Sequence, residues 1–168
     1  SKVTKNTDNS KVTKNTDKWI SSCISYRYDR CYIDLKIVIL GMPSAEKTSI
    51  INRLCNNHYI EDRPTIGAGF FSHMMNIDNK EVNLMLWETA GQERFKSVAP
   101  SLLRGSHGLV LVYDVTDEKT FDELENYLSL FLDAVDVSEC HCFPVLLLGN
   151  KIELGECSFA DKVEKWKE

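Results

Sequence analysis

Long apolar runs, paired cysteines and an excess of positive charge are all missing from this 168-residue sequence. No run approaches the roughly 18 to 20 apolar residues of a membrane-spanning helix, and the polar N-terminus lacks the pattern of a signal peptide. The six cysteines include no Cys-x-x-Cys pair, so their spacing indicates neither a zinc site nor a redox couple. Lys and Arg number 20 against 25 Asp and Glu, and this net charge of −5 argues against a nucleic-acid-binding surface. These absences favour a cytoplasmic protein with reduced thiols and no nucleic-acid partner.

The first 33 residues differ in composition from the rest of the chain. The octapeptide Ser-Lys-Val-Thr-Lys-Asn-Thr-Asp occurs at residues 1–8 and again at 10–17. Because the repeat is polar and residues 1–18 carry a net charge of +3 (five Lys against two Asp), we expect residues 1–18 to be disordered. Residues 19–33 show no clear period and are interpreted as a linker. Residues 34–168 are long enough for one buried domain.

Apolar patterns in the second segment predict strands that alternate with helices. The run Leu35–Leu40 ends at Gly41, as a buried parallel strand does. The other expected elements are a helix over 47–56, strands over 70–77 and 82–87 joined by a turn at Asp78-Asn79, strands over 109–115 and 145–148, and helices over 121–135 and 159–168. This order predicts an α/β fold with a mostly parallel sheet between two helical layers. Ligands of such sheets bind where strands end, so the loops beginning at Gly41, Glu88 and Gly149 form the candidate site.

The first of these loops has the spacing of a phosphate-binding loop. Lys47 and Thr48 follow Gly41 at the positions of the pattern Gly-x-x-x-x-Gly-Lys-Thr, but Glu46 stands where the second glycine is expected. In such a loop, main-chain N–H groups surround phosphate oxygens, the Lys reaches the terminal phosphates and the hydroxyl holds Mg²⁺. The loop residues expected to surround phosphate are Gly41, Ser44, Ala45 and Glu46. A plainer alternative is that Lys47 and Thr48 only begin a surface helix.

Three further segments follow this loop in a fixed order. Pro64-Thr65-Ile66-Gly67 lies between the first helix and the second strand, a run from Trp87 to Phe95 follows a strand, and Gly149-Asn150-Lys151-Ile152-Glu153 follows a later one. Together with the phosphate loop, these motifs resemble the Rab family of Ras-type small GTPases over residues 35–168. Cys142-Phe143-Pro144 before the last strand is similar to the late-endosomal branch of that family. The resemblance implies a P-loop NTPase-like three-layer sandwich and a GTP/GDP switch in vesicle trafficking.

The resemblance implies a guanine nucleotide and Mg²⁺ as ligands. Lys47 would contact the β- and γ-phosphates, Gly91 would donate its N–H to the γ-phosphate, and Gln92 would orient the attacking water as the catalytic residue. The expected Mg²⁺ ligands and their support are Thr48, Thr65 and Glu88. The expected guanine contacts are Asn150, Lys151 and Glu153. Because one phosphate orders two loops, protein partners would distinguish the GTP state from the GDP state.

The resemblance also implies protein and membrane partners. Phe70 and Trp87 match two of three apolar positions at which Rab proteins contact effectors and regulators, and the third, which is usually aromatic, is Leu102 here. Ordinary core packing is the alternative for Phe70 and Trp87. The family implies peripheral association with endosomal membranes. No prenylation motif stands at the C-terminus, so we expect only weak membrane binding.

Five residues of the candidate nucleotide site depart from the family pattern, and together they predict weaker nucleotide binding. Glu46 brings a carboxylate to the place where main chain approaches phosphate, and two like charges about 4 Å apart repel by about 4 kcal/mol at an effective dielectric near 20. Pro43 and Ser44 replace residues in a loop whose turn geometry favours glycine, and Pro43 removes one N–H donor. Glu153 replaces an Asp that binds the guanine edge, and a bent charge-assisted hydrogen bond costs about 1.5 to 3 kcal/mol. Glu88 replaces an Asp that supports Mg²⁺ through water, where extra length is easier to absorb.

The family pattern continues after the helix expected at residues 159–168, with a sixth strand and a last long helix that this sequence does not contain. Without them, we expect one unpaired sheet edge and one uncovered apolar face. Three hypotheses stay open at this stage: a Rab-type GTPase switch, a nucleotide-free Rab-like binding module, and a truncated, non-functional product that folds poorly.

Overall fold

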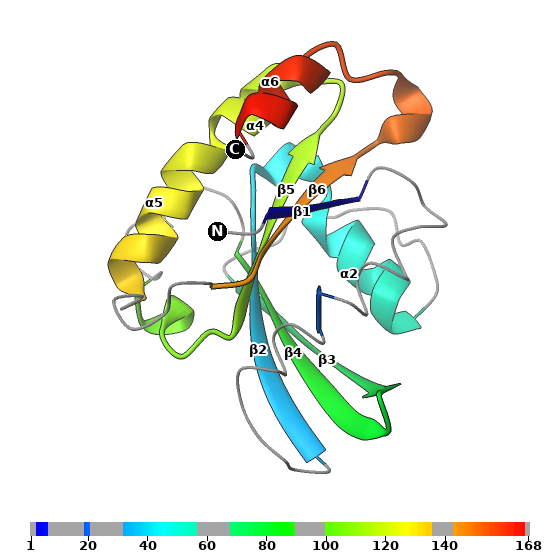
Figure 1. Cartoon of the computed structure of the whole chain (residues 1–168), viewed down its shortest axis with the longest axis vertical. Coiled ribbons are helices and arrows are strands. Elements are labelled where there is room, and N and C mark those ends of the chain that lie inside the picture. The colour runs from blue at the N-terminus through cyan, green and yellow to red at the C-terminus, as the bar shows by residue number, and fades with distance from the viewer. Residues whose placement is uncertain are drawn as a thin grey trace.

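A central sheet between two sets of helices forms the protein (Figure 1). The structure is a computed structural model that describes residues 3–6, 19–20, 32–56, 68–89, 100–135 and 143–166. One face of the sheet carries α2 (Lys47–Asn56), preceded by the short helix η1 (Pro43–Ala45). The other face carries α4 (Glu118–Asp122), α5 (Leu124–Ala134) and α6 (Ala160–Trp166). The α/β three-layer architecture expected from the sequence is confirmed, and no helix among the described residues is long and apolar enough to cross a membrane.

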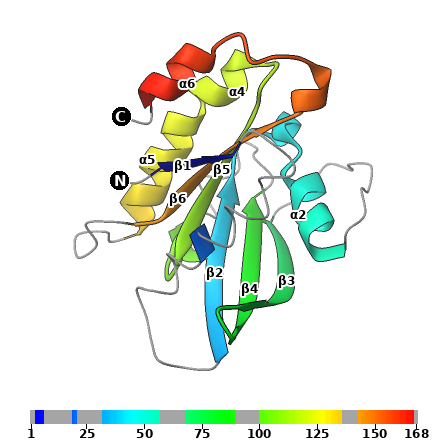
Figure 2. The same ribbon diagram turned by 45° about the vertical axis from the view of Figure 1, so that its right-hand side comes forward.

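The sheet has six strands in the order β1-β6-β5-β2-β4-β3. Their bounds are β1 (Val3–Asn6), β2 (Tyr32–Leu40), β3 (Ala68–Ile77), β4 (Lys80–Thr89), β5 (Gly108–Asp114) and β6 (Val145–Asn150). Every neighbouring pair is parallel except β3 and β4, which form an antiparallel hairpin (Figure 2). The turn residues Asp78 and Asn79 have φ values of 51° and 61°, a conformation that Asp and Asn adopt more readily than most residues.

Both faces of the sheet are buried, which explains the unbroken apolar runs of its central strands. Successive side chains of a strand point to opposite faces. Leu35 and Ile37 of β2 therefore pack with Ile51 of α2, whereas Val38 of the same strand packs with Phe131 of α5 on the other side. Two core clusters, one on each face, hold the helices against the sheet.

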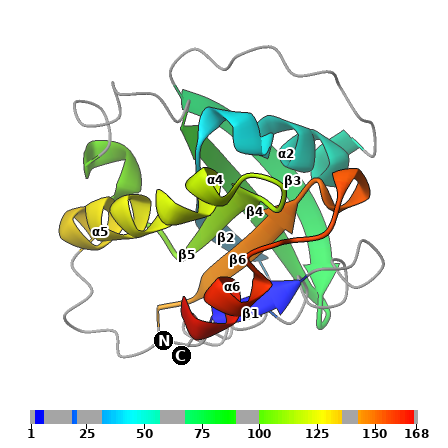
Figure 3. The same ribbon diagram turned by 90° about the horizontal axis from the view of Figure 1, so that it is seen from above.

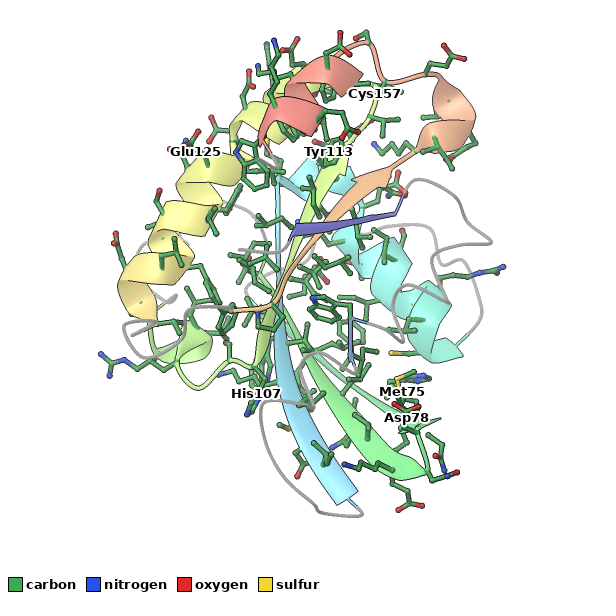
Figure 4. All side chains as sticks on the ribbon, viewed as in Figure 1. Met75, Asp78, His107, Tyr113, Glu125 and Cys157 are labelled. Atoms are coloured by element: carbon green, nitrogen blue, oxygen red, sulfur yellow. The ribbon has the colours of Figure 1, made fainter. Side chains whose placement is uncertain are left out.

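An aromatic cluster fixes α4 and α6 near the carboxyl end of β5. Between ring centroids, Tyr113 lies 5.2 Å from Phe121 and 6.0 Å from Phe159, and Phe121 lies 5.9 Å from Trp166. Figure 4 shows Tyr113 next to α6 and near Cys157. Burial, with a smaller effect of Cys157, raises the pKa of Tyr113 to about 12, so its phenol is protonated at neutral pH. The cluster therefore behaves as packed core at the end of the strand that leads to the candidate site.

The helices and strands expected in residues 34–168 are confirmed, with one difference. The helix expected over 121–135 is two helices, α4 and α5, and it begins earlier than expected. The reason for the early start is Asp117, whose carboxylate accepts a hydrogen bond from the Lys119 N–H at 3.1 Å and so caps α4.

Two segments before β2 belong to the fold, contrary to expectation. Val3–Asn6 form β1, which pairs with β6, so the expected disorder of residues 1–18 is wrong for these four residues. We expected one unpaired sheet edge where the family has a further strand, but β1 covers the outer edge of β6. The physical reason is that an edge strand presents unpaired N–H and C=O groups to any extended segment nearby. Trp19 and Ile20 are buried in the core cluster on the α2 side.

The other residues before Tyr32 lie outside the described residues, and the domain boundary expected after residue 33 falls inside β2. Cys55 and Cys157, the two cysteines in the part of the chain that the structure describes, carry free thiols as expected.

We predict that Phe131→Ala lowers the free energy of unfolding by about 3–5 kcal/mol, because Phe131 is fully buried and its removal leaves a cavity. Leu132→Ala is the matched control: its side chain is exposed on the same helix, and we expect a change within about 0.5 kcal/mol. Urea denaturation followed by circular dichroism measures both. Similar losses for the two variants would contradict the assignment of this helix face to the core.

Candidate functional site

The loop after β2 has the form of a phosphate-binding loop. Gly41 has a φ of 150°, and a Cβ at this position would collide with the carbonyl oxygen of Val112, so only glycine fits. The Lys47 side chain is buried, and its Nζ donates a hydrogen bond to the main-chain carbonyl of Met42 in the same loop at 3.0 Å. Lys47 is the first residue of α2, but its side chain is buried rather than exposed on a surface helix. Ala45 is fully buried beneath the loop, whereas Ser44 is exposed.

Glu46 adopts the backbone conformation for which the motif uses glycine. Its φ and ψ are 58° and 45°, the left-handed region, which costs a residue with a Cβ about 1 kcal/mol. Its side chain points to Lys151, with 3.7 Å between Glu46 Oε1 and Lys151 Nζ, and is about one third exposed. The charge repulsion expected at this position is therefore partly offset, because an ammonium group and solvent both reach the carboxylate.

Thr48 and Glu88 meet at the start of α2. The Thr48 hydroxyl lies 2.8 Å from each carboxylate oxygen of Glu88, to which it donates, and the Glu88 side chain at the end of β4 is buried. A hydroxyl and a carboxylate are the oxygen ligands that Mg²⁺ prefers. These two residues fit a magnesium ion in chemical type and in position beside the buried Lys47. The extra methylene of Glu88 brings its carboxylate into direct contact with the hydroxyl.

The loop after β6 is tied to the phosphate loop and to β5. The Asn150 side-chain amide donates to the Ala45 carbonyl at 3.0 Å. The Lys151 Nζ lies 2.9 Å from Asp114 Oδ2, and Asp114 Oδ1 accepts from the Thr116 N–H at 2.8 Å and from its hydroxyl at 2.6 Å. Side-chain contacts thus join three segments at the carboxyl ends of β2, β5 and β6. Figure 3 shows the ribbon from above, with β5 and β6 side by side.

Asp114 belongs to this junction, and sequence reasoning did not select it as a site residue. Burial alone would raise the pKa of its carboxyl, but the hydrogen bonds from Thr116 and Lys151 outweigh burial and lower the pKa. The pKa of Lys151 is raised, since its hydrogen bond and charge pairing with Asp114 and Glu46 outweigh its desolvation. The signal in the sequence was an acidic residue directly after the buried run 109–113, at the end of a strand where ligands bind.

The structure does not bring every predicted site residue into the junction of strand-end loops. Glu153 is exposed in the short helix η2 (Ile152–Leu154), after the loop that holds Lys151. Three predicted site residues lie outside the part of the chain that the structure describes: Thr65, Gly91 and Gln92. The structure therefore brings together the phosphate loop, Thr48, Glu88, Asn150 and Lys151.

Phe70 and Trp87, two of the expected partner-contact residues, form a surface patch on the sheet face opposite α2. The Phe70 ring is half exposed and lies 4.7 Å from the Trp87 ring, measured between centroids. The Lys36 ammonium lies 5.5 Å from the Trp87 ring centroid. Trp87 and Leu102 are partly buried against the core cluster of this face. Core packing is therefore the wrong interpretation for Phe70, although Trp87 contacts both the core and the surface patch.

The fold and these loops define a phosphate-loop α/β domain, and comparison with known proteins gives its family. The model of the Ras family matches residues 36–167. The chain belongs to the Ras family, as the resemblance predicted, and within it to the Rab-type proteins of the branch that includes Rab7 and ypt7.

Three relatives show this similarity. The chain is 43% identical over 123 residues to the Ypt/Rab-type GTPase ypt7 of Schizosaccharomyces pombe, covering 73% of this chain and 60% of that protein. It is 41% identical over 121 residues both to the Ras-related protein RABG3b of Arabidopsis thaliana and to the Ras-related protein Rab7 of Glycine max, covering 71% of this chain. These matches cover 60% and 59% of the two plant proteins, so the chain spans about three fifths of the length of these relatives.

We predict that Asp114→Asn lowers the free energy of unfolding by about 1–3 kcal/mol at pH 7, because Lys151 and Thr116 lose a charged, buried acceptor. The folded-state pKa of Asp114 is lowered, so its stabilisation is complete above the unfolded value near 3.8 and is lost as pH falls through the folded value. The difference between wild type and variant is therefore expected to shrink below pH 4.

Denaturation at pH 7, 5 and 3 measures this difference. Asp133→Asn, at an exposed position of α5, is the control and is expected to leave the difference near zero at each pH. A constant penalty for Asp114→Asn down to pH 3 would mean that packing, rather than charge, accounts for the loss.

Proposed function

We propose that this chain is a Rab-type guanine-nucleotide-binding protein that changes between GDP and GTP states and acts in vesicle trafficking. The observation that carries this proposal is the junction of strand-end loops around Lys47, Thr48–Glu88 and Asn150–Lys151. These are a phosphate ligand, an Mg²⁺ site and a base-recognition turn, in the order that the motifs have along the chain. One of the relatives named above, ypt7 of Schizosaccharomyces pombe, is named a Ypt/Rab-type GTPase, which supports the same function.

In the proposed complex, the chain's own residues divide the nucleotide among them. Lys47 binds the terminal phosphates from its buried position in the loop, and Asn150 and Lys151 hold the guanine base, with Glu153 nearby on the surface. The residues that would hold Mg²⁺ are Thr48, Glu88 and, in the GTP state, Thr65. Bound Mg²⁺ supplies positive charge that neutralises the phosphates. Gln92 positions the attacking water, and Gly91 contacts the γ-phosphate.

We expect the affinity for guanine nucleotide to be lower with Glu46 than with a glycine at this position. The Glu46 carboxylate stands at the last residue before α2, where helix N–H groups would otherwise face only phosphate. The Glu46 carboxylate points to Lys151, but its negative charge stays within the candidate site. Mg²⁺ binding must also replace the direct contact between Thr48 and Glu88. Both features oppose binding of the anionic nucleotide and its metal.

A titration with Mg·GDP tests the proposal. We expect wild type to bind weakly and Glu46→Gly to bind at least about tenfold more tightly, since the change removes a negative charge and a strained backbone residue. Isothermal titration calorimetry measures the affinities. A ligand at 100 times its dissociation constant raises stability by about 2.7 kcal/mol, so thermal unfolding with and without Mg·GDP gives an independent measurement.

Lys47→Met is the matched control for this titration, because methionine keeps the buried apolar stem and loses the ammonium. We expect the Mg·GDP response to disappear in the combined variant Glu46→Gly, Lys47→Met. No response to Mg·GDP in any of the proteins would reject the switch.

A nucleotide-free Rab-like binding module is the second candidate, and the exposed Phe70 beside Trp87 favours it. In this function, Rab effectors and regulators contact Phe70, Trp87 and Leu102 on a surface that requires no nucleotide. We propose endosomal membranes as the place of action in either case, from the family of the relatives. A well-folded protein whose thermal midpoint ignores Mg·GDP would support this candidate, whereas poor dispersion of amide signals in a proton NMR spectrum would indicate a non-functional, poorly folded product.

A further inference from the structure

The outer edge of β6 is covered by a strand from the beginning of the chain. β1 runs parallel to β6, and Val3 pairs with Val145, Thr4 with Leu146, Lys5 with Leu147 and Asn6 with Leu148. All three ribbon views show β1 beside β6 at this edge of the sheet (Figures 1, 2 and 3). The contact consists of a main-chain ladder between segments more than a hundred residues apart, so β1 adds to the sheet like a bound peptide.

A second contact from the same part of the chain enters the core on the α2 side. Trp19 is 5% exposed and Ile20 is fully buried, and both pack in the cluster that contains Ile37 and Val110. Gly108, the first residue of β5, provides the room for the indole. A Cβ at Gly108 would lie 2.8 Å from Trp19 Cζ2 and 3.1 Å from the Ile37 side chain. The indole therefore occupies a place that a larger residue would close.

The fit of this second contact is incomplete. The Trp19 indole N–H is buried and has no hydrogen-bond partner among the described residues. A buried donor without a partner opposes burial, because water would satisfy it outside the protein. The first contact is short, with four ladder residues, and residues 7–18 separate it from Trp19. The two contacts are small, and the sequence between them is polar. A segment held in this way can detach from the domain and bind again without unfolding it.

We propose that the β6 edge and the indole site over Gly108 form one peptide-docking site, and that Val3–Asn6 and Trp19–Ile20 occupy it as the two contacts of an exchangeable strap. The partner that this surface fits is an extended peptide that adds a parallel strand to β6 and places an aromatic–aliphatic pair in the core. In this protein the occupant is the chain's own Val3–Asn6 with Trp19–Ile20. The strap pairs with the strand that leads to Asn150 and Lys151, but the proposal does not depend on nucleotide binding.

The first experiment tests the edge contact in the full chain. Thr4→Pro with Lys5→Pro removes two successive main-chain N–H groups, one of which faces β6 because N–H groups alternate in direction along a strand. We expect the β6 amides that face β1 to exchange with deuterium at least about tenfold faster. The matched control is Thr13→Pro with Lys14→Pro in the second copy of the octapeptide, which we expect to leave this exchange unchanged. Equal exchange rates in the two variants overturn the proposal.

The second experiment tests exchange of the strap with a labelled synthetic peptide of residues 1–22, followed by fluorescence anisotropy. Trp19→Ala in the full chain weakens its own strap, so we expect it to bind the peptide at least about tenfold more tightly than wild type, in which the site is already occupied. Gly108→Ala also releases the strap, but its methyl group closes the indole site, so we expect no gain in peptide binding.

Gly155→Ala is the control for a glycine substitution, because a Cβ there meets no atom closer than 3.9 Å, and wild-type binding is expected. If Trp19→Ala does not fold, Thr4→Pro with Lys5→Pro serves as the acceptor with a weakened strap. Equal binding by the strap variant and Gly108→Ala, or no gain in binding by the strap variant, overturns the proposal. Nucleotide affinity is not a readout in either experiment, so failure here leaves the proposed function unaffected.

Discussion

The arrangement of the site depends on the ion pair between Lys151 and Asp114. Lys151 follows β6 and Asp114 ends β5, so this 2.9 Å contact joins two neighbouring strand ends. A buried carboxylate is costly unless it is paired and hydrogen-bonded, and Asp114 meets both conditions through Lys151 and Thr116. The Lys151 ammonium also lies 3.7 Å from Glu46 Oε1, so the same cation pairs with a carboxylate of the phosphate loop. The loops that would hold a nucleotide are thus already connected by the chain's own charges.

Three glutamates stand where the family uses glycine or aspartate, and the surroundings of their side chains differ. Glu46 accepts a left-handed backbone and turns its carboxylate to Lys151. Glu88 uses its length to reach the Thr48 hydroxyl inside the protein. Glu153 stays exposed on η2. The fold therefore accommodates all three, but the first two place their charge and their hydrogen bonds inside the site where phosphate and metal would bind.

Much of the site could be predicted from the sequence, because loops at the carboxyl ends of parallel strands meet at one edge and their residue types show their chemistry. Lys47, Thr48, Glu88 and Asn150 are brought together in this way. Asp114 was missed because an acidic residue after a strand is common, and its importance comes only from the approach of Lys151. The direction of the Glu46 side chain was equally hidden, since rotation into solvent and pairing with a cation are both compatible with the local sequence.

The sequence by itself determined the helices and strands, the parallel sheet and the order of the motifs, because apolar periodicity and motif spacing are local properties of the chain. Only the tertiary structure decided which residues cover the β6 edge and the Gly108 position, and which cation faces Glu46. These contacts join distant positions, as the hydrogen bond from Asn150 to Ala45 does across 105 residues of sequence. A polar repeat such as Ser-Lys-Val-Thr-Lys-Asn-Thr-Asp has no strong preference of its own, so the strand in its first copy forms only where β6 offers unpaired main-chain groups.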